Sequence, residues 1–296
     1  MASPEFQMVL DRLKDRPISR GVQPLRERMD SIGDAFAPPD DVVITPGEAN
    51  GVPMELLTPP AGTSRRTVLY LHGGGYMAGS LKSTRHLVGH LAKDCAVNVL
   101  NVDYRLAPEH PFPAAVEDAL AAYRWLLDQG RDSEAIAIAG DSAGGGLALS
   151  LGHAIRQEGL DSPGAVVALS PVTDFTLSGE SYQTNRETDV MVDQTLEEDS
   201  RMHYLNGQDP ENPLASPLFG DFAGYPPLLL QVSKVEILYS DAERVAEKAR
   251  AAGVDVTFSP YDEMVHVWQY FIAFLPEAQQ AMAEIRDFLT QKLAGA

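Results

Sequence analysis

The sequence predicts an α/β fold in which a mostly parallel β-sheet is flanked by helices on both faces. From residue 42 onward, short runs of β-branched and apolar residues alternate with longer runs of helical periodicity, which is typical of parallel strands joined by crossover helices. Runs such as Val68–Leu71 and Leu228–Leu230 are apolar at every position, as expected of strands buried on both faces. The chain has 296 residues, of which 44% are hydrophobic and 22% charged, and this composition fits one globular domain with an insertion.

Eight segments have the length and composition of strands, and five segments between them have helical periodicity. The predicted strands are Asp41–Thr45, Pro53–Leu57, Thr67–His72, Ala96–Val102, Ala135–Gly140, Ala165–Ser170, Pro227–Ser233 and Val254–Ser259. The predicted helices are Lys82–Asp94, Ala114–Gln129, Ala143–Glu158, Ser240–Ala252 and Pro276–Leu293. We therefore expect an eight-stranded sheet, with residues 41–296 as the main domain.

Two segments interrupt the alternation, residues 1–40 and residues 176–217. Apolar residues recur at helical spacing in both, at Phe6, Val9 and Leu13 and again at Leu196 and Leu205. We predict that residues 1–40 and the insertion at about 176–217 are helical and form a cap over the active edge of the sheet. The first six residues are also typical of a vector-derived leader, with Met8 as the candidate native start.

The charge of the chain excludes several classes of partner. The 23 Lys and Arg residues against 42 Asp and Glu residues give a formal charge of −19, and no basic run occurs. Nucleic acid and anionic membrane surfaces are bound through Lys and Arg, so neither is an expected partner. No apolar stretch is long enough to span a bilayer. The oligomeric state stays open, with a homodimer among the candidates.

Cysteine usage points to a reducing compartment. Cys95 is the single cysteine, which excludes a disulfide framework and any multi-cysteine metal site. The N-terminus lacks a basic segment followed by an apolar one, so we expect no cleaved export signal and a cytoplasmic protein. His86 and His90 lie four residues apart, but no third ligand is in view, and a solvated helix face is the expected alternative to a metal site. The acidic residues Asp174 and Glu197 are likewise expected on a solvated face.

The segment Gly140–Gly144 reads Gly-Asp-Ser-Ala-Gly and lies between a predicted strand and a predicted helix. A serine on such a sharp turn projects its hydroxyl above the edge of the sheet, and the flanking glycines let strand and helix approach each other. The helix start behind it supplies the free N–H of Ala143. No phosphate-binding glycine pattern follows, so the segment predicts that Ser142 is a nucleophile rather than part of a phosphate-binding turn.

A second glycine-rich segment, His72–Tyr76, follows another apolar strand and reads His-Gly-Gly-Gly-Tyr. Three consecutive glycines expose backbone N–H groups that can converge on a developing oxyanion, and a side chain would obstruct that approach. The alternative is a flexible turn without a chemical role.

Together with Asp103–Ala114 and the Ser-Pro-Val-Thr-Asp segment at Ser170, these motifs resemble the bacterial hormone-sensitive-lipase-like (family IV) carboxylesterases, which have the α/β-hydrolase fold. The resemblance runs in order from about residue 42 to the C-terminus. It implies that Ser142 forms an acyl-enzyme and that Gly73, Gly74 and Ala143 form the oxyanion hole. It also implies an N-terminal helical cap completed by an insertion after the sixth core strand.

The order of catalytic residues in this fold, serine then acid then histidine, selects the general base. Of the seven histidines, His266 alone follows the last strand. The family commonly reads His-Gly-Phe here, and Val267-Trp268 departs from that pattern. Because the base must be neutral, we expect activity to fall as the pH drops through a value near 6.5, the ordinary pKa of histidine.

The acid is the least determined member of the triad. Glu236 occupies the position of the family's Asp-Pro-Leu aspartate, whereas Asp241 has the commoner residue type and Asp262 lies four residues before His266. Ser240–Glu243 has the pattern of a capping box, which would make Asp241 a first-turn residue of a helix. We therefore favour Glu236 and keep Asp241 and Asp262 as alternatives.

The resemblance implies a serine carboxylesterase for small or medium neutral acyl esters that needs no cofactor and no metal. A lactone or amide hydrolase with the same triad is one alternative. A ligand-binding receptor on the same fold is another, since the family includes plant hormone receptors that have lost the catalytic histidine. The presence of Ser142, the glycine segment and His266 together favours an enzyme.

Overall fold

The computed structural model describes residues 2–14 and 21–294, and its sheet has eight strands in the order β1-β2-β4-β3-β5-β6-β7-β8. Strands β3 to β8 run parallel, while β2 is antiparallel to both β1 and β4. Their bounds are β1 Val43–Ala49, β2 Val52–Thr58, β3 Thr67–Leu71, β4 Asn98–Val102, β5 Ile136–Asp141, β6 Ala165–Leu169, β7 Leu228–Ser233 and β8 Val256–Tyr261. The predicted eight-stranded, mostly parallel sheet is confirmed.

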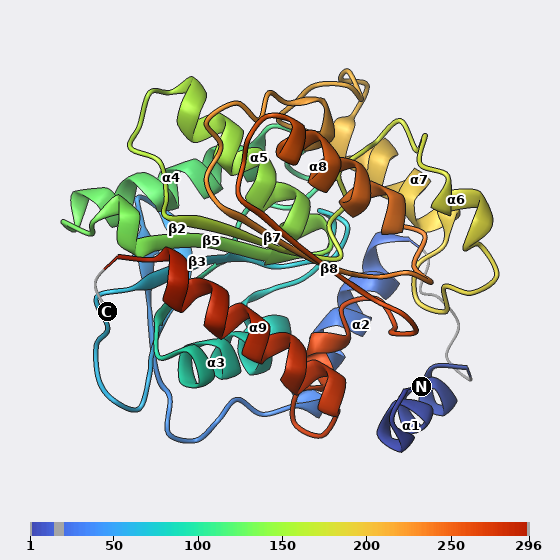
Figure 1. The fold of residues 1–296 in the computed structure, drawn as a ribbon, viewed down its shortest axis with the longest axis horizontal. Helices are drawn as coiled ribbons and strands as arrows, with labels where there is room; N and C mark the ends of the chain where they lie inside the picture. Colours follow the sequence, from blue (N-terminus) through green and yellow to red (C-terminus); the bar gives the residue numbers. More distant parts are fainter. Residues whose placement is uncertain (1, 15–20, 295–296) are drawn as a thin grey trace.

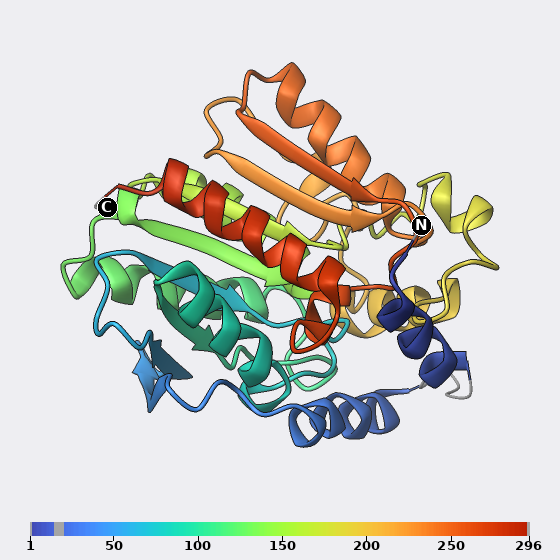
Figure 2. The same cartoon turned by 60° about the horizontal axis from the view of Figure 1, so that its bottom comes forward.

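Helices cover both faces of the sheet (Figures 1 and 2). On one face lie α3 (Leu81–Cys95) and α9 (Pro276–Lys292), and on the other lie α4 (Ala114–Asp128), α5 (Ala143–Gln157) and α8 (Tyr239–Ala251). Alternate residues of the strands enter two separate cores, so that Leu69 and Leu71 pack on one face while Val68 and Tyr70 pack on the other. This double burial explains why β3 is apolar throughout.

The segments that interrupt the alternation are helical in the structure. They form α1 (Pro4–Lys14), α2 (Val22–Ala35), α6 (Ser181–Thr184) and α7 (Gln194–Leu205). Residue 1 and residues 15–20 of the first segment lie outside the described residues. In Figure 1, α1, α6 and α7 gather beyond the carboxyl ends of the parallel strands. Phe6 and Val9 are buried, so the apolar face of α1 packs inward.

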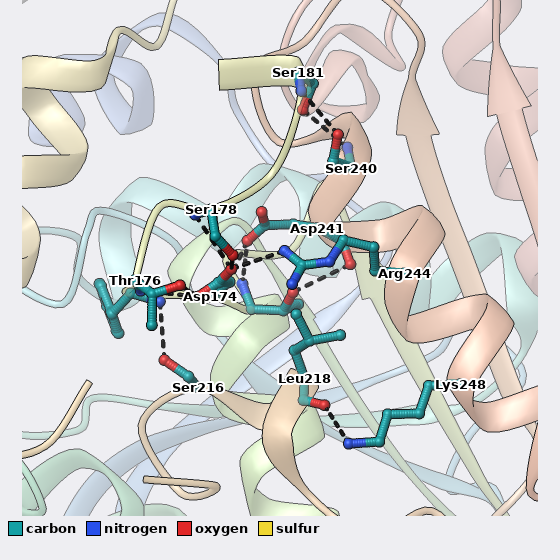
Figure 3. Close-up of polar contacts among 12 residues, drawn as sticks. Asp174, Thr176, Ser178, Ser181, Ser216, Leu218, Ser240, Asp241, Arg244 and Lys248 are labelled. Carbon is teal, nitrogen blue, oxygen red and sulfur yellow. Dashed lines mark hydrogen bonds and ion pairs between the residues drawn. The ribbon is translucent and has the colours of Figure 1, made fainter. Parts of the chain in front are cut away.

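The insertion is tied to α8 by buried polar contacts (Figure 3). Arg244 forms an ion pair of 2.8 Å with Asp174, and Ser178 Oγ donates to the same carboxylate at 2.6 Å. The backbone N–H of Ser181 donates to Ser240 Oγ at 2.8 Å. The expectation of a solvated face is therefore wrong for Asp174, whose side chain is fully buried and accepts hydrogen bonds.

Two further expectations are corrected by local packing. The helix α8 begins at Tyr239, so its N-cap residue is Leu238, whose side chain cannot cap it; Ser240 lies inside the first turn, where its Oγ accepts the N–H of Ser181. His86 is buried, with Nδ1 at 2.7 Å from the carbonyl of Ala37, so it does not lie on a solvated face. Within residues 2–14 and 21–294, no helix is both long and apolar enough to cross a membrane.

Candidate active site

Ser142 lies on the sharp turn between β5 and α5. Its φ of 54° and ψ of −124° place it in a backbone conformation that costs about 1–3 kcal/mol and occurs mainly at functional sites. Backbone hydrogen bonds hold this turn, because Ser142 N–H donates to Leu169 O at 2.8 Å and Ser142 O accepts from Val172 N–H at 3.1 Å. The side chain is half-buried at the edge of the sheet.

The two glycines of this turn are required by close backbone approach. A Cβ at Gly140 would lie 2.2 Å from the carbonyl oxygen of Gly144, and a Cβ at Gly144 would lie 2.1 Å from the carbonyl oxygen of Leu71. Both distances are far below van der Waals contact, so any side chain would displace α5 from β3 and β5. The glycines therefore fix where the hydroxyl of Ser142 stands.

The glycine-rich segment lies beside this turn, and its first glycine is not available to a substrate. Gly73 is buried, and its N–H donates to Asp141 Oδ1 at 3.1 Å. Tyr70 Oη donates to the same oxygen at 2.7 Å. The expectation that Gly73 donates to an oxyanion is thus wrong, since its one N–H is already used by the carboxylate that precedes Ser142.

Three other N–H groups near this turn are candidates instead. Gly74 and Gly75 are half-buried, and among the described residues neither N–H has a hydrogen-bond acceptor. Ala143 is the first residue of α5, where the N–H has no partner within the helix. Gly74 adopts a φ of 119°, and a Cβ there would lie 2.3 Å from the carbonyl of Ala78, so this position also requires glycine.

The structure brings Glu236 and His266 together in the loops that follow β7 and β8. His266 Nδ1 lies 2.6 Å from Glu236 Oε2, and the two side chains are almost fully buried. The other carboxylate oxygen accepts hydrogen bonds from Ser170 Oγ and from the N–H of Ser233, each at 2.8 Å. A carboxylate with every oxygen occupied leaves His266 Nδ1 as the donor and its Nε2 free to accept a proton.

Burial and the neighbouring carboxylates act in opposite directions on His266. Burial disfavours the imidazolium, but the attraction of Glu236 and its hydrogen bond outweigh that effect and raise the pKa of His266 above its ordinary 6.5. Within the described part of the chain, Ser142 Oγ makes no hydrogen bond; catalytic hydrogen bonds often tighten only when substrate binds.

The alternative acids lie elsewhere. Asp262 is exposed and forms an ion pair of 2.6 Å with Lys234. Asp241 is buried, and its Oδ2 accepts the N–H groups of Thr173 and Asp174 at 2.7 and 3.0 Å, in the group of contacts drawn in Figure 3. Burial raises the pKa of Asp241 to about 8. Neither carboxylate is hydrogen-bonded to His266.

The residue after His266 explains a departure from the family pattern. Val267 has a φ of 48°, a left-handed conformation that is unfavourable for a β-branched residue and that glycine adopts freely. Its N–H donates to Ser170 Oγ at 3.4 Å, and the same hydroxyl donates to Glu236 Oε1, so Ser170 connects this turn to Glu236. The valine therefore keeps the backbone course that glycine would favour, at the cost of local strain.

A cavity of about 620 Å³ lies between α1 and the loops that carry Glu236 and His266. Its wall is mostly apolar and includes Phe6 and Leu10 from α1, Val190 from the insertion, and Met264. Its size falls in the range of small-molecule sites. Phe6 is buried beside this cavity, whereas Met8 is 55% exposed.

Sequence reasoning missed two residues of this site. Asp141 links Ser142 to the glycine-rich segment, and its role depends on Tyr70 and Gly73, which a linear motif does not show. Gly75 is the other, and the run of three glycines was the available signal. No group of three or more His, Cys, Asp and Glu side chains suited to a metal occurs among the described residues.

Comparisons with known proteins identify the family of this chain. A family model described as alpha/beta hydrolase fold matches residues 68–270. An acetyl-hydrolase of Streptomyces hygroscopicus is 42% identical over 295 residues, covering 98% of this chain and 97% of that protein. An ethyl acetate hydrolase of Pseudomonas putida is 33% identical over 262 residues, covering 86% and 82% respectively. An esterase from the bacterial hormone-sensitive lipase (HSL) family superposes with a TM-score of 0.94 at 42% identity, over 99% of each chain.

Proposed function

Because this chain belongs to the bacterial hormone-sensitive lipase family of the α/β-hydrolase fold and is a carboxylesterase, we propose that Ser142, His266 and Glu236 are its catalytic triad. The observation that supports this most is the buried contact of 2.6 Å between His266 and Glu236, in the loops next to the turn that carries Ser142. It combines a base held in one tautomer with a serine on a strained turn, the pair that acyl transfer requires.

In the first half-reaction, His266 Nε2 takes the proton of Ser142 as Oγ attacks the ester carbonyl carbon. The carbonyl oxygen becomes an oxyanion, which the N–H groups of Gly74, Gly75 and Ala143 stabilise. Each such donor contributes about 2.7–4 kcal/mol to lowering the barrier. The tetrahedral intermediate collapses to the acyl-enzyme, and the departing alcohol takes the proton from His266.

In the second half-reaction, water replaces the alcohol. His266 removes a proton from the water, and the hydroxide attacks the acyl carbon of the ester on Ser142. The second tetrahedral intermediate then releases the carboxylic acid, and Ser142 recovers its proton from His266. Glu236 stabilises the imidazolium that forms in both halves.

The substrates proposed are neutral esters with small or medium acyl groups. Relatives named acetyl-hydrolase and ethyl acetate hydrolase support short acyl chains. We also propose that residues 1–40 and 176–217 are the two parts of a cap, since α1 and Val190 of the insertion wall the cavity beside Glu236. That cavity would accommodate part of an ester bound between the cap and the sheet.

Labelling of the nucleophile tests the proposal directly. A p-nitrophenyl alkylphosphonate should add one phosphonyl group to the protein and release one equivalent of p-nitrophenol, and peptide mass spectrometry should place the group on Ser142. The variant Ser142→Ala should neither be labelled nor hydrolyse p-nitrophenyl butyrate. Labelling at another residue, or hydrolysis that survives in Ser142→Ala with an unchanged melting temperature, would refute the assignment.

A further inference from the structure

The helix α7 lies with one face against the glycine-rich segment. Glu197, Ser200 and Tyr204 share that face, since they are spaced by three and four residues. Ser200 Oγ donates to the carbonyl of Gly75 at 2.7 Å, and the ring of Tyr204 stacks on Tyr76 with 3.8 Å between centroids. Glu197 is one helical turn before Ser200, so it lies on the same face of α7.

The carboxylate of Glu197 is buried without a hydrogen-bond partner. The residue is 3% exposed, its Oε2 is fully buried and unpaired, and no described residue donates to either oxygen. Leaving a buried polar group unpaired costs about 1–3 kcal/mol, and more for a charged one. The expectation that Glu197 lies on a solvated face is wrong, and packing alone does not explain a carboxylate here.

The groups that act electrostatically on Glu197 include one base, His266, and burial raises the pKa of Glu197 to about 7. They are His266 from the loop after β8, Asp189 and Asp193 from the segment before α7, Tyr76 from the glycine-rich segment, Tyr182 from α6 and Asp241 from α8. The hydroxyls of Tyr76 and Tyr182 are also buried and unpaired. His266 and Glu197 act electrostatically on each other, and Glu197 lies one helical turn from Ser200, which contacts Gly75; both observations place Glu197 near the proposed site.

We propose that Glu197 is a specificity-determining residue that accepts a hydrogen bond from a hydroxyl or ammonium group of the substrate, next to the scissile ester. This inference rests on the site proposed around Ser142. A hydrogen-bond donor supplied by the substrate would satisfy an acceptor that the protein leaves unpaired. A substrate with a methyl group at the same point would leave the carboxylate unpaired in the complex.

Such an arrangement discriminates strongly between two substrates of the same shape. A site built around a buried polar group rejects an analogue that lacks the matching group, because binding then seals the unpaired acceptor away from water. The complex with the analogue lacks one hydrogen bond to a charged group. Its kcat/KM should therefore be lower than that of the matching substrate by roughly tenfold or more. The phenols of Tyr76 and Tyr182 would contribute further hydrogen bonds to the same group.

Matched ester pairs test the inference on both sides of the scissile bond. On the acyl side, p-nitrophenyl butyrate is compared with p-nitrophenyl 3-hydroxypropanoate, in which a hydroxyl replaces the terminal methyl. On the alcohol side, propyl acetate is compared with 2-hydroxyethyl acetate, and 3-methylbutyl acetate is compared with 2-(dimethylamino)ethyl acetate, whose protonated amine is the ammonium arm. The wild-type enzyme should prefer the donor-bearing ester in at least one pair, and the two donor types separate a hydroxyl site from an ammonium site.

The variants Glu197→Gln and Glu197→Leu then assign that preference. Leucine should reduce the ratio of kcat/KM within the pair by about tenfold or more, and glutamine should reduce an ammonium preference more than a hydroxyl preference. The control Glu198→Gln changes the exposed neighbour on the same helix and should leave the ratio unchanged. Melting temperatures check that each variant is folded.

Two results would overturn the inference. One is a wild-type enzyme that discriminates in no pair, and the other is a Glu197→Leu variant that keeps the wild-type ratio. A uniform loss of rate on both members of a pair would show that Glu197 binds only a structural water or supports packing. Failure of the catalytic assignment is seen separately, as hydrolysis of p-nitrophenyl butyrate by Ser142→Ala.

Discussion

Replacing Glu236 by glutamine isolates the contribution of the acid, because the change keeps the shape of the side chain and removes its charge. In the folded protein Ser233 N–H and Ser170 Oγ both donate to Oε1. The backbone N–H cannot turn away, so the glutamine carbonyl oxygen should occupy that position. The amide nitrogen must then face His266 Nδ1 and donate to it.

This reversal changes the tautomer of the base. When Nδ1 accepts a hydrogen bond, it carries no proton, so the proton of the neutral imidazole lies on Nε2. A protonated Nε2 cannot accept the proton of Ser142. The equivalent loss in serine hydrolases is about 10⁴ in kcat, or about 5.4 kcal/mol of barrier. We expect a loss of that order for Glu236→Gln.

The assay is kcat for p-nitrophenyl butyrate at a pH where the wild-type base is neutral. Asp262→Asn is the matched control, since it removes the competing carboxylate with the same chemical change and breaks only a surface ion pair with Lys234. It should keep a rate near the wild-type one. A Glu236→Gln rate within tenfold of the wild type, or a large loss in Asp262→Asn, would refute the reasoning.

Four further predictions follow from the geometry. The raised pKa of His266 should put the midpoint of the acid limb of kcat/KM above 6.5, and a midpoint at or below 6.5 would contradict the part given to Glu236. Ser200→Ala removes the hydrogen bond to Gly75 O and should lower kcat about fivefold with little change in KM, whereas Ser200→Thr should restore the rate. An unchanged kcat would show that the glycine-rich segment keeps its position without this contact. Deleting residues 1–14 opens the cavity beside Glu236 and should change the preference among acetate, butyrate and hexanoate esters, whereas an unchanged preference would separate α1 from the cap. Burial raises the pKa of Asp241 to about 8, so this carboxyl ionises above about pH 4 in the unfolded chain but only near pH 8 in the folded one, and its contribution to the free energy of unfolding falls as the pH rises between these values. In urea unfolding, the free energy of unfolding of Asp241→Asn should therefore rise relative to that of the wild type from pH 6 to pH 8. A constant difference would show that burial does not hold this proton.

The fold could be predicted because its strands are buried on both faces and its helices are amphipathic, and both patterns are local in the sequence. The differences lie at the ends of elements. The predicted strand Asp41–Thr45 is β1, Val43–Ala49, which continues through Pro46 and Gly47. Proline is tolerated there because β1 is an edge strand that pairs only with β2, and its place in the sheet is not visible in its own residues.

In the candidate site too, features that are local in the sequence could be predicted, and features that depend on tertiary contacts could not. Ser142 and His266 lie in short motifs whose position relative to strands identifies them, so the sequence was sufficient to nominate them. Which glycine N–H is free depends on the side chain of Asp141, and the sequence alone placed Gly73 in the wrong role. The burial of Glu197 depends on which face of α7 meets the glycine-rich segment. The contacts of Ser200 and Tyr204 identify that face, and the sequence does not show them.

The acidity of the chain has a local counterpart in the site. Glu236, Asp189 and Glu197 all act on His266 in the direction that favours its imidazolium. In the proposed mechanism, these acidic groups would stabilise the cation that forms when Ser142 gives up its proton, and they would do so in a buried region where charges are weakly screened. The same field opposes an anion. Burial raises the pKa of Asp189 to about 6 and that of Glu197 to about 7, so this field strengthens as the pH rises through these values. A neutral ester enters without repulsion, and we expect the carboxylate product to bind more weakly as the pH rises.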